Sequence, residues 1–261
     1  MNKTMKTIVY REPVLRRPYL ICGLPGIGYV AKLSADYLKT QLNAELFEEV
    51  YSPSFPPYVL IRKNGIVELL KNEFYFWKNE SSSEHDLIIF SGNVQAGSPE
   101  GQFEIVEEIL KLATNFGVSK IFSIAAYVRQ QSIDAPKVFG AVTHQDLIPY
   151  LKKFGVDPME EGSISGTNGL LFGHAKLGDI QSICLLGETP FFSRQVVVDA
   201  KAAKAVLAVL TKMLKIKIDM EPLEKQAKLT EDFVNEVEEV SRRAIDEMQK
   251  AQEREVPRYY V

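Results

Sequence analysis

The sequence predicts a three-layer α/β/α sandwich with a C-terminal helical extension. Short continuous apolar runs are typical of buried parallel strands, and residues 86–127 read as a strand–helix–glycine–strand crossover unit. Residues 223–255 differ in composition, with ten acidic and six basic side chains and neither glycine nor proline. These observations favour an α/β domain over residues 1–218 and a helical extension over 219–261.

The first part of the domain alternates strands, a helix and a hairpin. Residues 19–22 form a short buried strand, and a helix follows the next glycine turn to about Leu42. Further strands are expected at 46–51 and 74–77. Between them Asn64-Gly65 separates two apolar runs, and Asn-Gly is the strongest short hairpin signal.

The second part repeats the strand–helix pattern. Ser98 and Pro99 form the cap and first position of a helix between strands at 86–90 and 120–127. The expected buried face of that helix comprises Phe103, Val106, Ile109, Leu110 and Ala113. Later elements are expected to be a short helix at 146–154, a strand at 179–186 and a long apolar helix at 194–214.

Composition indicates a soluble cytoplasmic protein. The chain has 261 residues, 46% hydrophobic and 25% charged, with a formal charge of −3. That charge gives no reason to expect nucleic acid, and we expect neither a membrane span nor a secretory signal. Cys22 and Cys184 lie in apolar runs and are expected to be reduced core residues.

The extension carries an apolar stripe at helical spacing, with Thr230 as a candidate N-cap. Its members are Leu229, Phe233, Val237, Val240, Ala244, Met248 and Ala251. Such a stripe needs a partner surface, and the sequence leaves open whether this is the parent domain or another subunit.

The first glycine turn is a candidate ligand site. Residues 26–31 fit G-x-G-x-x-A after a strand and before a helix, the context of a dinucleotide-binding turn, and Gly23, Gly26 and Gly28 would approach the ligand. Pro25 removes one amide donor, and no well-placed acidic residue follows a second strand. A tight turn built for helix–strand packing is the alternative.

Catalytic motifs are not evident elsewhere. His85, His144 and His174 lack metal-ligand spacing, and neither G-x-S-x-G nor a lysine-bearing phosphate loop is present. Residues 129–137 read as a polar surface loop. We therefore assign no catalytic residue, metal or cofactor, and expect that the protein is not an enzyme.

The last three residues, Tyr259, Tyr260 and Val261, have the properties of a docking tip. Two aromatic rings offer large apolar area with few rotamers to freeze, the phenol can hydrogen-bond, and a terminal carboxylate can pair with a lysine. Three residues are a short motif, and such motifs also occur by chance.

The chain resembles the proteasome assembly chaperone 2 family, particularly its archaeal members and their homologue B branch. Three segments carry the resemblance across most of residues 10–215: the turn at 23–28, the stretch at 90–102 and the stretch at 117–123. It implies an α/β/α sandwich similar to purine nucleoside phosphorylases, without their catalytic set.

The resemblance also implies a function. Family members that end in a hydrophobic-tyrosine-any tail bind the α subunits of the proteasome core particle, form homo-oligomers such as tetramers or pentamers, and work without ATP. On the matching positions, Tyr259 is the hydrophobic residue, Tyr260 the tyrosine and Val261 the last residue. The competing hypothesis is a nucleoside- or nucleotide-binding enzyme that uses the glycine turn.

Overall fold

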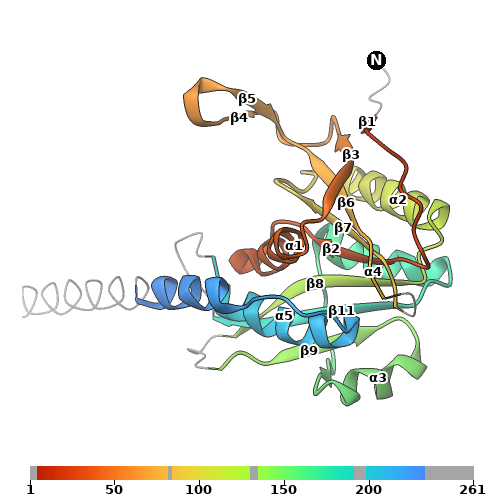
Figure 1. The fold of residues 1–261 in the computed structure, drawn as a ribbon, viewed down its shortest axis with the longest axis vertical. Coiled ribbons are helices and arrows are strands. Elements are labelled where there is room, and N and C mark those ends of the chain that lie inside the picture. Colours follow the sequence, from red (N-terminus) through yellow and green to blue (C-terminus); the bar gives the residue numbers. More distant parts are fainter. Residues whose placement is uncertain (1–4, 82–83, 130–134, 191–197, 233–261) are drawn as a thin grey trace, which may run out of the picture.

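The computed structural model describes residues 5–81, 84–129, 135–190 and 198–232. Its centre is a nine-stranded sheet in the order β1-β3-β6-β7-β2-β8-β11-β9-β10, shown in Figure 1. The strands are β1 (Lys6–Val9), β2 (Tyr19–Gly23), β3 (Glu45–Tyr51), β4 (Val59–Ile61), β5 (Val67–Leu69), β6 (Asn72–Trp77), β7 (Leu87–Gly92), β8 (Lys120–Arg129), β9 (Val138–Val142), β10 (Asp157–Pro158) and β11 (Ser182–Pro190). β4 and β5 pair only with each other, as a separate hairpin.

The middle of the sheet is parallel, and on each side an antiparallel pairing joins it to the outer strands. β7, β2, β8 and β11 run in one direction, whereas β6 and β9 pair antiparallel to this block. The α-helices are α1 (Val30–Gln41), α2 (Pro99–Asn115), α3 (Ile148–Lys153), α4 (Gly166–Leu177) and α5 (Ala200–Leu214). Short 3₁₀ turns are η1 (Ile27–Tyr29), η2 (Lys63–Gly65) and η3 (Gln145–Leu147).

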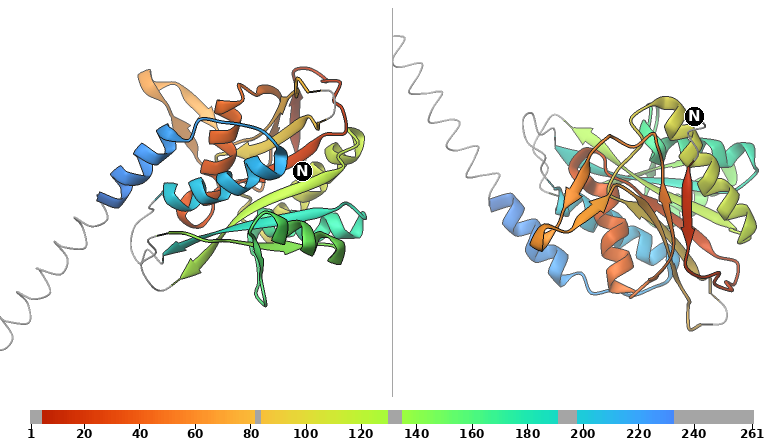
Figure 2. Two further views of the ribbon diagram at one scale, coloured as in Figure 1. Left: turned by 60° about the horizontal axis from the view of Figure 1, so that its bottom comes forward. Right: turned by 90° about the horizontal axis from the view of Figure 1, so that it is seen from above.

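Helices cover both faces of the sheet and complete the predicted three layers (Figure 2). Successive strand residues point to opposite faces. On β2, Ile21 packs with α1 and α5, whereas Leu20 and Cys22 pack with α2 and α4. The predicted α/β/α sandwich is therefore confirmed; its likeness to purine nucleoside phosphorylases stays a prediction.

Local signals account for most boundaries. Ser98 caps α2 by accepting the Gly101 amide at 3.1 Å, with Pro99 at the first turn. In the hairpin turn, Asn64 and Gly65 both adopt positive φ, of 65° and 75°, as an Asn-Gly pair can do at low cost.

The expected buried face of α2 is confirmed at Val106, Ile109 and Ala113, with Leu110 partly buried, but Phe103 is 41% exposed and Ile105 and Leu112 are buried as well. Several expected boundaries were wrong. α5 begins at Ala200 rather than 194, because Asp199 caps it by accepting the Ala202 amide. The strand expected at 179–186 runs from Ser182 to Pro190. Strands β1, β9 and β10 and helix α4 were not predicted at all.

The C-terminal extension packs on the domain where it starts. Residues 221–232 are helical, and Leu223 and Ala227 are buried in the core cluster of α1 and α5. Lys204–Glu224 and Lys201–Glu231 ion pairs of 2.8 and 2.7 Å join this helix to α5.

Thr230 was wrongly expected to cap the extension. It lies inside the helix and donates to the Gln226 carbonyl, whereas Asp219 accepts the Glu221 amide at the helix start. Leu229, the first stripe residue, is 70% exposed. Two positions along a helix turn by about 200°, so Leu229 faces away from buried Ala227. The other stripe residues lie outside the described ranges, and the division at 218/219 stays a prediction.

Glu48 of β3 is a buried carboxyl facing α2. Burial raises its pKa from 4.5 to about 7; the Glu108 carboxylate adds to the rise and Lys111 opposes it. An acid whose pKa is raised on folding destabilises the folded state when it ionises. The contribution of Glu48 to the free energy of unfolding therefore falls as the pH rises above 4.5, and it levels off above about pH 7.

We therefore expect Glu48→Gln to stabilise the protein in a pH-dependent way. The gain in free energy of unfolding is about 1–3 kcal/mol at pH 8 and close to zero at pH 4, since each pKa unit corresponds to about 1.4 kcal/mol. Urea unfolding of both proteins at these pH values measures the difference. A gain of equal size at both pH values would contradict it.

Candidate functional site

The three glycines of the first turn have different structural roles. A Cβ at Gly23 would lie 2.3 Å from the Ala31 carbonyl oxygen, so this glycine lets α1 cross β2 closely. Gly28 has a φ of 59° and lies against Asp199 and Thr189. Gly26 is extended, and a Cβ there would have no neighbour within 4 Å. Gly23 is thus required for helix packing, and Gly28 for the backbone conformation of the turn. Gly26 alone of the three faces open space.

Two polar side chains hold this turn to the neighbouring helix. Asn168 of α4 accepts the Leu24 amide at 3.1 Å and donates to the Leu24 carbonyl at 3.3 Å. Gln95 donates to the Pro25 carbonyl and accepts the Thr167 amide at 2.7 Å. These bonds occupy the Leu24 amide and the carbonyls of Leu24 and Pro25, and so fix the chain where it leaves β2. Moreover, α1 begins only after η1, with Tyr29 left-handed at its cap.

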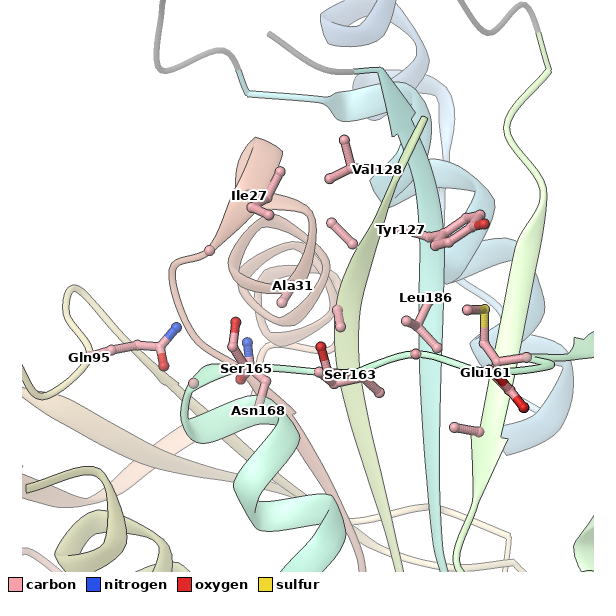
Figure 3. A pocket seen from close by; sticks show the side chains of 18 of the residues that line it. Ile27, Ala31, Gln95, Tyr127, Val128, Glu161, Ser163, Ser165, Asn168 and Leu186 are labelled. Carbon is pink, nitrogen blue, oxygen red and sulfur yellow. The ribbon is translucent and has the colours of Figure 1, made fainter. Parts of the chain in front are cut away.

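A cleft of about 1100 Å³ opens beside this turn, at the carboxyl ends of the parallel strands (Figure 3). The starts of η1 and α4 form one side, β8 and β11 form the other, and the 159–165 segment runs between them to the start of α4. Apolar side chains dominate its lining, namely Ile27, Tyr127, Val128, Met159, Ile164 and Leu186. Open sheets of this kind bind ligands at this edge.

The charge of the cleft does not suit a phosphate. Glu160 and Glu161 are its charged side chains, and no Lys, Arg or His is among its described lining residues. Its volume also lies at the top of the range of small-molecule pockets, roughly 300–1000 Å³. The cleft therefore suits an apolar chain segment with a basic group better than a nucleotide.

The sequence did not reveal this cleft. Gln95 belongs to a segment that carries the family resemblance. Asn168, Glu160 and Glu161 lie in segments for which the sequence predicts no helix or strand. The signal that was missed is the glycine-rich start of α4, where Gly169 lies against the Ile164 carbonyl with no room for a Cβ.

Other chemistry-bearing side chains have structural partners. His85 stacks on Tyr19, His144 bonds to Asp179 at 3.2 Å, and His174 meets the edge of Phe103. Within the described residues, no group of three or more His, Cys, Asp or Glu side chains is arranged to hold a metal ion. No described helix is long and apolar enough to cross a bilayer.

The two cysteines and the end of β8 are also structural. Cys22 and Cys184 are free and fully buried, and burial raises the pKa of Cys184 to about 12. Arg129 at the end of β8 pairs with Glu188 at 2.7 Å. Residues 130–134 of the expected surface loop lie outside the described ranges. So do Tyr259, Tyr260 and Val261, whose docking role stays a prediction.

Comparison with known proteins places this fold in a family. The sequence model of the PAC2 family matches residues 20–238. An uncharacterized protein of Methanocaldococcus jannaschii is 36% identical over 247 residues, covering 94% of this chain and 91% of the relative. The chain therefore belongs to the PAC2 family, as the sequence resemblance had indicated.

Two solved structures from Pyrococcus furiosus are similar throughout. PbaB, an archaeal proteasome activator, superposes with a TM-score of 0.84 at 42% identity, covering 90% of this chain and 99% of PbaB. PbaA, an archaeal homolog of proteasome-assembly chaperone, gives a TM-score of 0.73 at 28% identity, covering 95% of this chain and 98% of PbaA.

The glycine turn can be tested by substitution. We expect Gly23→Ala to lower the free energy of unfolding by about 1–3 kcal/mol, because a methyl group there forces α1 away from β2. Gly26→Ala is the matched control in the same turn and should change it by less than about 0.5 kcal/mol. Urea unfolding measures both. Equal losses of unfolding free energy in the two variants would mean that any substitution in the turn destabilises the protein, whether or not it lies under the helix crossing.

Proposed function

We propose that this protein is an ATP-independent proteasome assembly chaperone or activator of archaeal type, acting in the cytoplasm as a homo-oligomer. It docks on the α subunits of the proteasome core particle through a hydrophobic-tyrosine-any (HbYX) tail at Tyr259, Tyr260 and Val261. The activator role has the stronger support, because PbaB is the more similar of the two named Pyrococcus proteins in both fold and sequence.

The observation that carries the proposal is the tail on this particular fold. A chain of the PAC2 family ends in two aromatic rings, the second a tyrosine, followed by Val261. Burying one aromatic ring contributes about 2–3 kcal/mol of transfer free energy, and its hydroxyl adds a hydrogen bond. The carboxylate of Val261 supplies the charge that a pocket lysine would pair with.

One such anchor is too weak for lasting attachment. Several tails that reach neighbouring pockets together raise avidity by about 10²–10⁴, which supports a tetrameric or pentameric body. The helix at 221–232 lies beside α5 (Figure 1) and precedes the tail in sequence. We propose that residues 223–255 act as the stalk that presents it.

Substitutions at Tyr260 test the docking directly. We expect Tyr260→Ala to weaken binding to the core particle at least tenfold, and Tyr260→Phe to weaken it less because the ring remains. Surface plasmon resonance on immobilised core particle measures the affinities, and peptide hydrolysis by the core particle reports activation. Equal damage from Phe and Ala would assign the interaction to the hydroxyl.

Two tail variants complete this test. Deletion of residues 258–261 should abolish binding while leaving the thermal unfolding of the α/β domain unchanged. Addition of two glycines after Val261 keeps both rings but moves the carboxylate, and should weaken binding if the carboxylate pairs. Unchanged affinity of the deleted chain would refute the docking proposal.

The competing nucleotide-binding hypothesis makes a separate prediction. Because the cleft beside Gly26 has an acidic rim and the turn is held by Asn168 and Gln95, we expect isothermal titration with ATP, NAD or purine nucleosides to give no saturable heat. Proteasome binding should be unchanged after nucleotide removal. Micromolar affinity that Gly26→Val abolishes would instead support a ligand-binding protein.

A further inference from the structure

The β4–β5 hairpin exposes an apolar face to solvent. Its cross-strand pairs Val59–Leu69 and Ile61–Val67 point to the same side, and these four side chains are 45–73% exposed. The other side holds Leu60 and an Arg62–Glu68 ion pair. In Figure 1 the hairpin projects from the end of the molecule near β3, away from the sheet.

Such an arm is incomplete by itself. An isolated two-stranded hairpin is only marginally stable in water, and its regular inward–outward pattern should place the apolar side against a partner. Here the apolar side is the exposed one, as far as the described residues extend. Exposed contiguous apolar patches of this kind mark interaction sites.

The area of the face limits what can cover it. An aliphatic side chain buries roughly 60–120 Å², so four supply roughly 250–500 Å². A standard stable interface buries about 800 Å² per partner. Two hairpins stacked face to face would therefore fall short, whereas a concave receptor would enclose the hairpin on more than one side.

The same chain carries a receptor with matching properties. The cleft beside the glycine turn is lined by apolar side chains, among them Ile27, Tyr127 and Met159, and its volume of about 1100 Å³ exceeds what a small ligand needs. Glu160 and Glu161 give its rim a negative charge. At the hairpin tip Arg62 is paired with Glu68 and Lys63 is exposed, so arm and cleft are complementary in apolarity, and Lys63 supplies a charge opposite to that of the rim.

We infer that the hairpin of one subunit docks in the cleft of a second copy of this chain. This inference rests on the homo-oligomer of the proposed function and specifies its contact. Because arm and cleft are different surfaces, the contact is head-to-tail, and repetition with a closing rotation produces a ring. A ring presents its tails in a common direction, as docking on the α ring requires.

Variants at exposed positions test the contact without disturbing the core. The arm variant is Ile61→Glu with Val67→Glu, both well exposed in the single chain. The cleft variant is Ile27→Glu, at a residue 59% exposed. Leu177→Glu is the matched control, an exposed apolar residue at the C-terminal end of α4, whereas the cleft is lined by the N-terminal end of that helix.

Light scattering of the full-length chains measures the result. We expect the wild-type and control proteins to be oligomers, and the arm and cleft variants to be monomers with unchanged circular dichroism. An equimolar mixture of the two variants should form dimers and nothing larger, since one intact arm can then meet one intact cleft.

Two outcomes would overturn the inference. An arm variant that keeps the wild-type mass shows that the oligomer forms elsewhere, and monomers in the mixture exclude arm-in-cleft docking. Neither outcome affects the tail, because binding of the core particle is measured separately. A monomeric arm variant should still bind through its single tail, with avidity reduced by about 10²–10⁴, and lose that binding on Tyr260→Ala.

Discussion

The close approach of α1 and α5 to the central strands is the constraint on which the rest of the structure depends. Gly23 ends β2 under the Ala31 carbonyl, and Gly187 of β11 lies under Val206 and Ala202 of α5. A side chain at either glycine would push a helix away from the sheet. Because interiors are close-packed, neighbouring side chains could not absorb that shift.

The position of these helices determines the shape of the carboxyl edge of the sheet. With α1 close to β2, the turn before it bends aside, and Asn168 and Gln95 bond its backbone to the start of α4. The turn therefore forms one wall of this edge, held in place by these two side chains. On the far side of that wall, the ends of β8 and β11 leave an apolar cleft with an acidic rim.

This arrangement leaves apolar side chains exposed at several places on the molecule. The carboxyl edge of the sheet presents Tyr127, Met159 and Leu186, with Glu160 and Glu161 at its rim. The hairpin at the other end of the sheet order is apolar outward, and the helix after α5 turns Leu229 to solvent. Exposed apolar surfaces of this kind are unfavourable in water when the chain is alone, and a larger assembly would cover them.

The sequence by itself determined the layers, most strands, the Ser98 cap, the Asn64-Gly65 hairpin and the family, because these depend on local periodicity, turn chemistry and short motifs. It also supplied the only description of the tail. It did not determine β1 and β10, which are short edge strands, or β9 beside β10, because short strands near a sheet edge are weakly patterned. It also missed the start of α5, because whether Asp199 caps a helix depends on contacts such as that with Thr189. Only the tertiary structure showed that residues near 26, 127 and 160 share one cleft. Such contacts join segments far apart in the sequence, and local patterns carry no information about them.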